Sequence, residues 1–379
     1  MTRARLVLLA LVLLASRAGA QASEFGTRAL GLPVLPLGAR AQGMGGGIAL
    51  FDPENSLNPA AIWITQRGTA TFSVRQYWRT SENPFGIADG NDTQFPLVMV
   101  TGPIGPRWDF GVSVSAYSDR TFALALADTI DIRETPVGLN DTLISKGGVN
   151  DIQVAAAYTV SSRLSFGIGL HVLTGTNRFE YRRVFSDSSY VPVRIKNELS
   201  FSGPGISAGF TAEPIKRVRL AGMARWDGDL AFYKDSTKLS EIPMPLTFAG
   251  GIEVAAGDRL ILAGHGLYRT WSAADDWIKE RGGLGAENAA EAAFGLEWTR
   301  NTRKPFKFPL RAGVRYAQLP YPIIAGSRGS EVQVSLGTGF RFTANRGSVD
   351  FAIERAWRDD DAGLKEKSFM FTFGVGIRP

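Results

Sequence analysis

Large apolar residues and small or polar residues alternate along most of the chain. From 369 to 377 every second residue is Phe, Val or Ile, with Met, Thr or Gly between them. The stretch 332–336 alternates in the same way, with Val and Leu at every second position. Strict alternation predicts a strand with one apolar and one polar face. The pattern predicts fourteen strands, near 68–78, 94–102, 108–117, 149–160, 163–174, 198–213, 218–229, 244–256, 259–270, 290–300, 308–318, 331–342, 348–358 and 367–378.

The connections between these strands fall into two alternating sets, one short and one mostly long. An even number of antiparallel strands with short turns at one end and long loops at the other is typical of outer-membrane barrels. Eleven residues at ~3.3 Å each, tilted by ~40°, span roughly 28 Å along the membrane normal, close to the apolar band of such barrels. The fold class predicted is therefore all-β, a 14-stranded antiparallel transmembrane β-barrel. The stretch 121–131 also alternates, but we assign it to a loop, partly because a fifteenth strand would break the even count.

Charged residues share the parity opposite to the large apolar side chains. A charge on the lipid face costs about 2–4 kcal/mol near the bilayer midplane, so this parity is expected to face the lumen. Both signs are present, and we interpret most of these groups as structural ion pairs, with selection of a charged solute as the sharper alternative. The predicted lumen-lining charges are Arg75, Asp109, Arg219, Arg225, Glu253, Arg311, Arg315, Glu331, Arg341, Asp350 and Glu354.

Tryptophans gather at strand ends, as expected of rings that prefer lipid–water interfaces. Six of them are predicted to form two girdles, with Trp78, Trp226, Trp271 and Trp357 at the loop end and Trp108 and Trp298 at the turn end.

The first twenty residues have the features of a removable export signal. Two arginines precede the apolar run 6–15, and residues 18–20 are Ala-Gly-Ala, small enough for signal peptidase. Cleavage would leave Gln21 as the first residue. No later stretch is apolar enough over 18 residues for a membrane helix.

Residues 21–66 do not alternate cleanly and are predicted to form a plug inside the lumen, with residues 67–379 as the barrel. Glycine occupies four of the five positions 43–47, which permits backbone conformations closed to other residues. A segment of this length is too short for a domain, but it could fill the lumen of a 14-stranded barrel.

This segment resembles the N-terminus of the FadL/TodX and PorV/PorQ group of outer-membrane proteins. That group shows a Gly-x-Arg-Ala element, a Met-Gly-Gly-like stretch, an acidic residue and an Asn-Pro-Ala triplet before the first strand. The matching positions, covering about 25 residues, are Gly38, Arg40, Ala41, Met44, Gly45, Gly46, Asp52, Asn58, Pro59 and Ala60.

The resemblance implies a 14-stranded barrel with an N-terminal plug or hatch. FadL-type members pass long-chain fatty acids or other hydrophobic compounds, whereas PorV-type members are accessory shuttles in protein secretion. The sequence from Gly38 to Gly46 resembles PorV-type members more than FadL-type members. Two positions depart from the group: the chain ends in Ile-Arg-Pro instead of an aromatic residue, and Pro53 stands where small residues are usual.

Composition argues against an enzyme, and no cofactor or metal site is expected. The chain has no cysteine and only two histidines, His171 and His265. Residues 205–209 fit the Gly-x-Ser-x-Gly pattern around Ser207, but that elbow needs a following helix, and here it lies inside a predicted strand. The histidines show no evident Asp-His-Ser arrangement in the sequence. Basic residues alternate with acids, which disfavours nucleic-acid binding.

The long loops carry the remaining candidate features. The loop 118–148 contains an apolar segment with Phe122, Leu124 and Leu126, which could collect a hydrophobic ligand, dock a protein or extend a strand above the membrane. Ser272 and Asp275 predict a short helix in the loop 271–289.

The function predicted is passage of a fatty-acid-like hydrophobic molecule by displacement of the plug, with Arg40 and Asn58 as candidate anchors between plug and wall. The alternative is a non-conducting, PorV-like barrel that docks secreted proteins. In either case we expect a monomer in the outer membrane of a Gram-negative-type bacterium. Its expected partners are membrane lipids, the barrel-insertion machinery and either a hydrophobic small molecule or a secreted protein.

Overall fold

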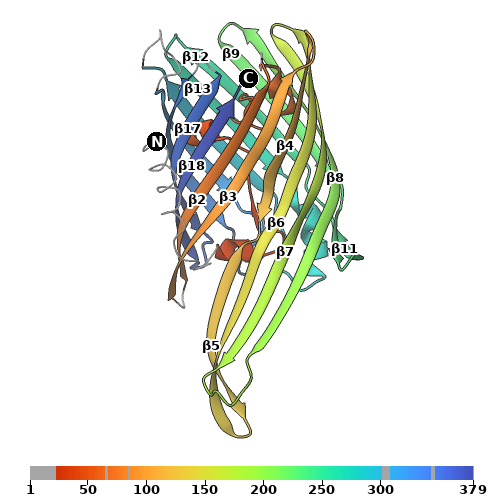
Figure 1. The fold of residues 1–379 in the computed structure, drawn as a ribbon, viewed down its shortest axis with the longest axis vertical. Coiled ribbons are helices and arrows are strands. Elements are labelled where there is room, and N and C mark those ends of the chain that lie inside the picture. The colour runs from red at the N-terminus through yellow and green to blue at the C-terminus, as the bar shows by residue number, and fades with distance from the viewer. Residues whose placement is uncertain (1–22, 65–66, 84–85, 301–307, 343–345, 379) are drawn as a thin grey trace, which may run out of the picture.

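A computed structural model describes residues 23–378, except 65–66, 84–85, 301–307 and 343–345. The predicted export signal and Gln21 lie outside the described residues. Fourteen antiparallel strands form a closed barrel (Figure 1), because β18 pairs with β2 and β9 pairs with β12. The prediction of a 14-stranded barrel is confirmed. In order around the wall, the strands are β2 (Thr69–Asn83), β3 (Gly86–Pro103), β4 (Trp108–Asp119), β6 (Thr135–Ser161), β7 (Leu164–Phe185), β8 (Val193–Ile215), β9 (Val218–Asp227), β12 (Thr247–Ala256), β13 (Leu260–Arg269), β14 (Ala289–Trp298), β15 (Leu310–Gln318), β16 (Ser330–Phe342), β17 (Gly347–Asp359) and β18 (Lys365–Ile377).

Alternation along each strand separates the two faces of the wall. On β7, Phe166, Ile168 and Leu170 are exposed on the outer face, while Ser165 and His171, which flank them at positions of the opposite parity, are buried. In the part of the chain that the structure describes, closure leaves no free sheet edge in the wall, so the backbone groups there pair with neighbouring strands, as a lipid environment requires. Among the described residues, no helix is long and apolar enough to cross a membrane.

Strands β6, β7 and β8 continue well beyond the barrel at its loop end, where they form a projecting sheet with β5 (Phe122–Ile132) (Figure 1). We call this sheet, residues 122–146 and 177–198, the blade. The assignment of 121–131 to a loop was wrong: β5 is a strand, but it pairs with β6 outside the barrel and leaves the even strand count intact. The alternation in this stretch therefore correctly indicates a β-strand.

Two further loops carry secondary structure. Strands β10 (Leu230–Lys234) and β11 (Thr237–Ile242) form a hairpin that pairs with β8. The loop after β13 contains η3 (Trp271–Ala274) and α3 (Asp275–Lys279), so the short helix is present, although neither helix has a side-chain cap at its N-terminus.

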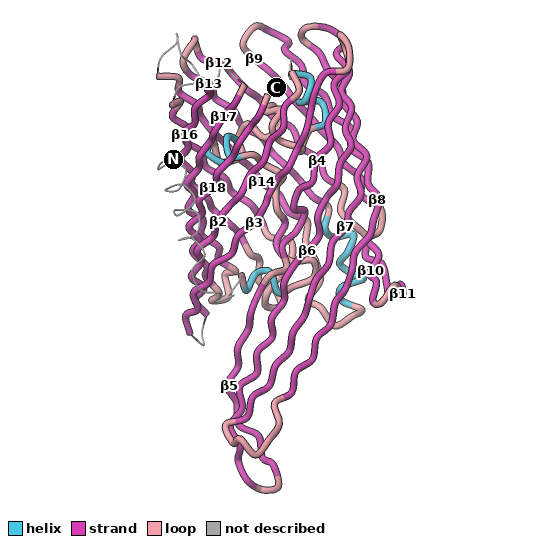
Figure 2. The backbone as a smooth tube through the Cα atoms, in the orientation of Figure 1, coloured by secondary structure: helices cyan, strands magenta, loops and turns pink. Residues whose placement is uncertain are grey.

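The N-terminal segment, residues 23–64, lies inside the barrel (Figure 2). It consists of η1 (Glu24–Thr27), β1 (Leu32–Pro33), α2 (Ala39–Gly43) and η2 (Pro59–Ile64), joined by irregular chain. The two residues of β1 pair with β4, α2 contacts β16 and β17, and η2 contacts β6, β7 and β8. The segment therefore touches opposite sides of the wall.

Glycines allow the segment to approach the wall at backbone distance. A Cβ added at Gly313 of β15 would lie 2.1 Å from the backbone carbon of Met44, and one at Gly295 of β14 would lie 2.2 Å from the Met44 carbonyl oxygen. Gly43 and Gly337 of β16 face each other in the same way, with a Cβ on Gly43 at 2.9 Å from the Gly337 Cα. We call these contacts the glycine seam. No side chain larger than hydrogen fits there without moving one backbone away from the other.

The glycine seam predicts that Gly313→Ala destabilises the protein by about 1–3 kcal/mol, because the added methyl group must push the N-terminal segment off the wall. The measurement is the free energy of unfolding of the purified protein in lipid vesicles. Gly266→Ala is the matched control, since its Cβ would meet nothing closer than 3.9 Å. Equal stability of the two variants would show that the seam is loose.

Candidate functional site

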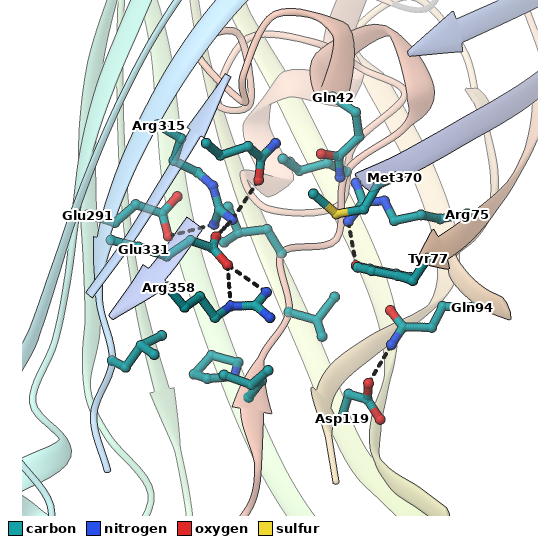
Figure 3. A pocket seen from close by; sticks show the side chains of 18 of the residues that line it. Gln42, Arg75, Tyr77, Gln94, Asp119, Glu291, Arg315, Glu331, Arg358 and Met370 are labelled. Carbon is teal, nitrogen blue, oxygen red and sulfur yellow. Dashed lines mark hydrogen bonds and ion pairs between the residues drawn. The ribbon is translucent and has the colours of Figure 1, made fainter. Parts of the chain in front are cut away.

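Five charged side chains form a continuous ladder across the lumen face of β14 to β18. Figure 3 shows the first four, Glu291, Arg315, Glu331 and Arg358. Arg315 pairs with Glu291 at 3.5 Å and with Glu331, and Arg358 pairs with Glu331 through Nε at 2.6 Å and with Glu366. Acid and base alternate from strand to strand, so each interior member of the ladder has partners on both sides. A buried charge is tolerated only when it is paired and hydrogen-bonded, and this arrangement meets that condition.

Glu354 is the most deeply buried acid beside the ladder, with no exposed surface. Its oxygens accept hydrogen bonds from Gln333 at 2.7 Å and Thr372 at 2.9 Å, and Arg75 lies 3.4 Å away. Arg75 also donates to the hydroxyl of Tyr77 at 3.0 Å. Charges from β2, β16, β17 and β18 thus belong to one network.

A second network, nearer the turn end, ties the N-terminal segment to the wall. Arg40 binds both oxygens of Glu297, at 3.0 and 2.9 Å, and lies 3.5 Å from Asp52 of its own segment. Glu297 also accepts from Arg311 at 2.6 Å, and Arg311 reaches Asp350 at 2.5 Å. Arg40 therefore shares its wall partner with another arginine.

Asn58, the second candidate anchor, also contacts the wall. Its amide nitrogen donates to the carbonyl oxygens of Leu50 at 3.0 Å and Phe210 at 3.3 Å, and its oxygen accepts from the Ala60 backbone at 3.0 Å. Phe210 belongs to β8, so both candidate anchors do touch the barrel.

The other residues of the motif are all buried between segment and wall. The Gly38 backbone donates to Asn55 at 2.7 Å, and Asp52 accepts from the Glu54 backbone at 3.1 Å. Gly45 and Gly46 have φ of +62° and +87°, conformations that favour glycine. Ala41 and Met44 pack into one apolar cluster with Ile48 to Phe51, while Pro59 and Ala60 begin η2.

The remaining predicted lumen charges also point inward. Arg219 pairs with Glu253 at 2.5 Å, and Arg225 pairs with Asp151 at 2.5 Å and Asp227 at 2.8 Å. Asp109 is buried and Arg341 is half-buried. Among the described residues, no group of three or more acids and histidines could hold a metal ion.

The charge ladder and the N-terminal segment border a small cavity of about 60 Å³. Arginines outnumber acids in its lining, with Arg79 and Arg269 beside the ladder's own pair and Arg75. Because one water molecule occupies about 30 Å³ of liquid, the cavity has room for water but not for an acyl chain. At this level the lumen leaves no room for a hydrophobic ligand.

Between this cavity and the loop end, the barrel is filled by an apolar cluster. Trp271 and Tyr321 lie at its centre with their rings 5.3 Å apart, and Phe232 stacks on Trp277 at its edge. We call it the loop-end cluster; its buried members are Leu30, Val149, Leu173, Phe201, Leu230, Ile242, Met244, Trp271, Ala274, Ile278, Ala286, Ala289 and Tyr321.

Trp271 corrects the predicted tryptophan girdle. Its side chain is only 1% exposed, because η3 turns it into the loop-end cluster instead of onto the outer face. The other five predicted interface tryptophans, Trp78, Trp108, Trp226, Trp298 and Trp357, are exposed. Strand-end position alone does not distinguish the two environments.

One arrangement of side chains was missed in the sequence. His171 Nδ1 lies 2.9 Å from Asp151, and His171 Nε2 lies 2.8 Å from the Ser207 hydroxyl. The expectation that the histidines lack an Asp-His-Ser arrangement was wrong for His171. The Gly-x-Ser-x-Gly pattern involves Ser207 alone, whereas His171 and Asp151 come from the neighbouring strands β7 and β6.

Comparisons with solved structures identify the same architecture in a group of channels. A Pseudomonas aeruginosa FadL homologue superposes with a TM-score of 0.62 at 14% identity, covering 92% of this chain and 99% of its own. The Ralstonia pickettii toluene transporter TbuX gives 0.61 at 14% identity over 91% and 99%. The Pseudomonas putida toluene transporter TodX gives 0.57 at 15% identity over 91% and 98%.

No protein-family model matches the chain, and no curated protein matches it. The structural matches span nearly the whole of each neighbour, so the chain has the FadL/TodX fold, and the suspected resemblance to that group is confirmed. The secretion-accessory role of PorV-type proteins receives no support from these neighbours.

The charge ladder predicts that Arg358→Met destabilises the protein by about 3–5 kcal/mol, because Glu366 is left buried without its arginine. Arg178→Met removes an exposed pair with Glu198 in the blade and should leave stability unchanged. Urea unfolding from lipid vesicles, followed by tryptophan fluorescence, compares the two variants. Similar stabilities would mean that water screens the ladder.

Proposed function

We propose that this protein is an outer-membrane channel that passes a hydrophobic small molecule past its N-terminal segment. The fold is that of channels whose names describe transport of toluene or other monoaromatic hydrocarbons. The observation that carries the proposal is a largely apolar surface that runs from the blade to the loop-end cluster.

The two faces of the blade differ in chemistry. Strand pairing places Leu124, Leu143, Tyr181 and Ile195 in one row across β5, β6, β7 and β8. Phe122 and Phe179 flank this row on the same face. Leu124 and Leu126 are 39% and 62% exposed, while Phe122 is buried at 4%.

The opposite face is small and charged. Ala125, Thr142, Arg182 and Arg194 form its central row, and Glu180 pairs there with Arg194 at 2.6 Å. A blade that only extended the barrel into water would have no physical reason to keep one face apolar.

The apolar face is continuous with the lumen side of the wall. Along β7, Leu173 in the loop-end cluster and Phe179 and Tyr181 on the blade have the same parity. The pairing of β6 with β7 keeps one register from the barrel into the blade. A hydrophobic molecule held on the blade can therefore move toward the loop-end cluster past Phe179, over whose ring the Arg120 guanidinium lies at 5.0 Å.

One ion pair interrupts this face near the tip, between Asp141 and Arg183. Two hydrogen bonds join the pair, at 2.8 and 2.6 Å, and the bonds from Arg183 lower the pKa of the Asp141 carboxyl. The rest of the face is mostly aliphatic and aromatic, with Ser145 and Asn197 in the row of Phe122 and Phe179, and Asp128 opposite Leu139 near the tip.

Passage beyond the loop-end cluster requires the N-terminal segment to move, because the cavity below is too small for an organic ligand. The absence of native cysteines allows this movement to be tested with one engineered disulfide. The Gly46 and Ala293 positions are suitable: a Cβ on Gly46 would lie 3.8 Å from that of Ala293 on β14, the spacing of a normal disulfide.

Gly46→Cys with Ala293→Cys should take up labelled oleate or toluene at the background rate when oxidised and recover uptake after reduction. The assay uses a Gram-negative host without its own fatty-acid channel, and each single-cysteine variant is the control for the strain of a side chain at Gly46. Equal uptake in the oxidised and reduced states would show that the segment need not move.

The blade makes a separate prediction. Leu124→Asn with Leu126→Asn should raise the half-saturating ligand concentration several-fold and leave the maximal rate unchanged, because capture is weakened but the lumen is untouched. Ala125→Asn with Ala127→Asn alters the opposite face of the same strand and is the matched control. If both pairs behave alike, the apolar face does not collect ligand.

A further inference from the structure

Three consecutive strands bring a serine, a histidine and an aspartate together on the lumen side of the wall. Ser207 lies on β8, His171 on β7 and Asp151 on β6, and all three are buried. The Ser207 hydroxyl is 2.8 Å from His171 Nε2, and His171 Nδ1 is 3.0 and 2.9 Å from the two Asp151 oxygens. These distances and this order of contacts define a serine hydrolase triad.

We propose that Ser207, His171 and Asp151 hydrolyse esters of hydrophobic carboxylic acids within the lumen, an activity beyond transport. In this arrangement Asp151 accepts a hydrogen bond from His171 Nδ1–H and so fixes the tautomer whose Nε2 can take a proton from Ser207. Arg225 holds Asp151 from another side, with Nη1 at 2.5 Å from its Oδ2, so the carboxylate is fixed in position.

The surroundings of Ser207 include a hydrogen-bond donor for the substrate oxygen. A Cβ built on Gly169 would lie 2.6 Å from the Ser207 hydroxyl, 2.8 Å from Gln153 Nε2 and 3.1 Å from His171 Nε2. These three polar atoms therefore converge on a position that only glycine leaves open. Ser113 donates to the Gln153 side-chain oxygen at 3.3 Å, which leaves the Gln153 NH₂ group facing His171, 3.5 Å from its Nε2 and beside the Ser207 hydroxyl that Nε2 contacts.

The reaction follows from these roles. The Ser207 oxygen forms a bond with the ester carbonyl carbon while His171 takes its proton, and the Gln153 NH₂ group donates to the developing oxyanion. Collapse breaks the bond to the alcohol oxygen, which leaves with the proton from His171. Water then attacks the acyl-serine, gives a proton to His171, and releases the carboxylic acid as Ser207 regains its proton.

The N-terminal segment restricts access to this site. Asn58 lies against Gly209 of β8, two residues from Ser207. The Pro59–Ala60 backbone lies against Gly167 of β7, two residues from Gly169. A cavity of about 30 Å³ between the segment and the wall, lined by Asp151 and Arg225, is large enough for a water molecule. An ester reaches Ser207 only when this part of the segment shifts.

The test uses the full-length protein in lipid vesicles with a fluorophosphonate bearing an alkyl chain. The Ser207 oxygen would bond to phosphorus and displace fluoride, while His171 takes the proton, and mass spectrometry would identify the modified residue. Asn58→Ala removes the hydrogen bonds to Leu50 and Phe210 and should increase the labelling rate several-fold.

Ser207→Ala should abolish labelling and the hydrolysis of a p-nitrophenyl alkanoate. His171→Gln keeps a hydrogen-bonding group but removes the base, and should slow labelling at least about a hundredfold. Ser165→Ala, at another fully buried lumen serine, should label at the wild-type rate. Heat-modified electrophoretic mobility verifies that each variant is folded.

Labelling at Ser207 that depends on His171 would establish the triad. The proposal is overturned if folded wild-type and Asn58→Ala proteins both remain unlabelled at Ser207, or if His171→Gln labels as fast as wild type. Neither result depends on whether the barrel transports a ligand.

Discussion

One constraint governs this molecule: the outer face of the wall meets lipid, so the charges of the membrane-spanning strands must turn inward and find partners there. The lumen is too narrow for each charge to remain in bulk water, and the described pairs show how the chain meets this condition. The ladder from Glu291 to Glu366 alternates in sign from strand to strand. Antiparallel pairing sets Arg358 directly opposite Glu331 and Glu366. Arg315 reaches Glu291 and Glu331 diagonally, two positions along the neighbouring strands, which a long side chain can span.

The N-terminal segment takes part in this pairing. Arg40 satisfies Glu297 of β14, and Glu54 pairs with Arg378 after β18. The wall therefore contains charges whose partners belong to the segment, and the glycine seam keeps the two in register. Movement of the segment must exchange these ion pairs for water or for other side chains, which links opening of the lumen to its electrostatics.

Much of this fold could be predicted from the sequence because strand alternation has a period of two and lipid enforces it over each strand. The same parity correctly separated inward charges such as Arg315 from outward residues such as Phe371. It failed where lipid no longer acts. Trp271 has the sequence context of an interface residue, but a short helix turns it into the loop-end cluster, and β5 lies outside the membrane-spanning wall.

The contact between Ser207 and His171 could not be predicted from either residue alone, because it depends on how far β7 is offset against β8. A weaker signal was present. Asp151, Gln153, His171 and Ser207 all share the lumen parity on three consecutive strands, so a register in which they meet was among the few possible. The pairing of Gly169 with Ser207 sets the register that brings His171 and Ser207 together.

The blade has a further consequence for how this protein meets its surroundings. The twelve residues 135–146 of β6 extend past the barrel, and at ~3.4 Å per residue they reach roughly 40 Å. In the proposed location, that distance carries the apolar face well away from the membrane surface. A hydrophobic solute could then leave water at the blade and travel the remaining distance to the barrel along protein.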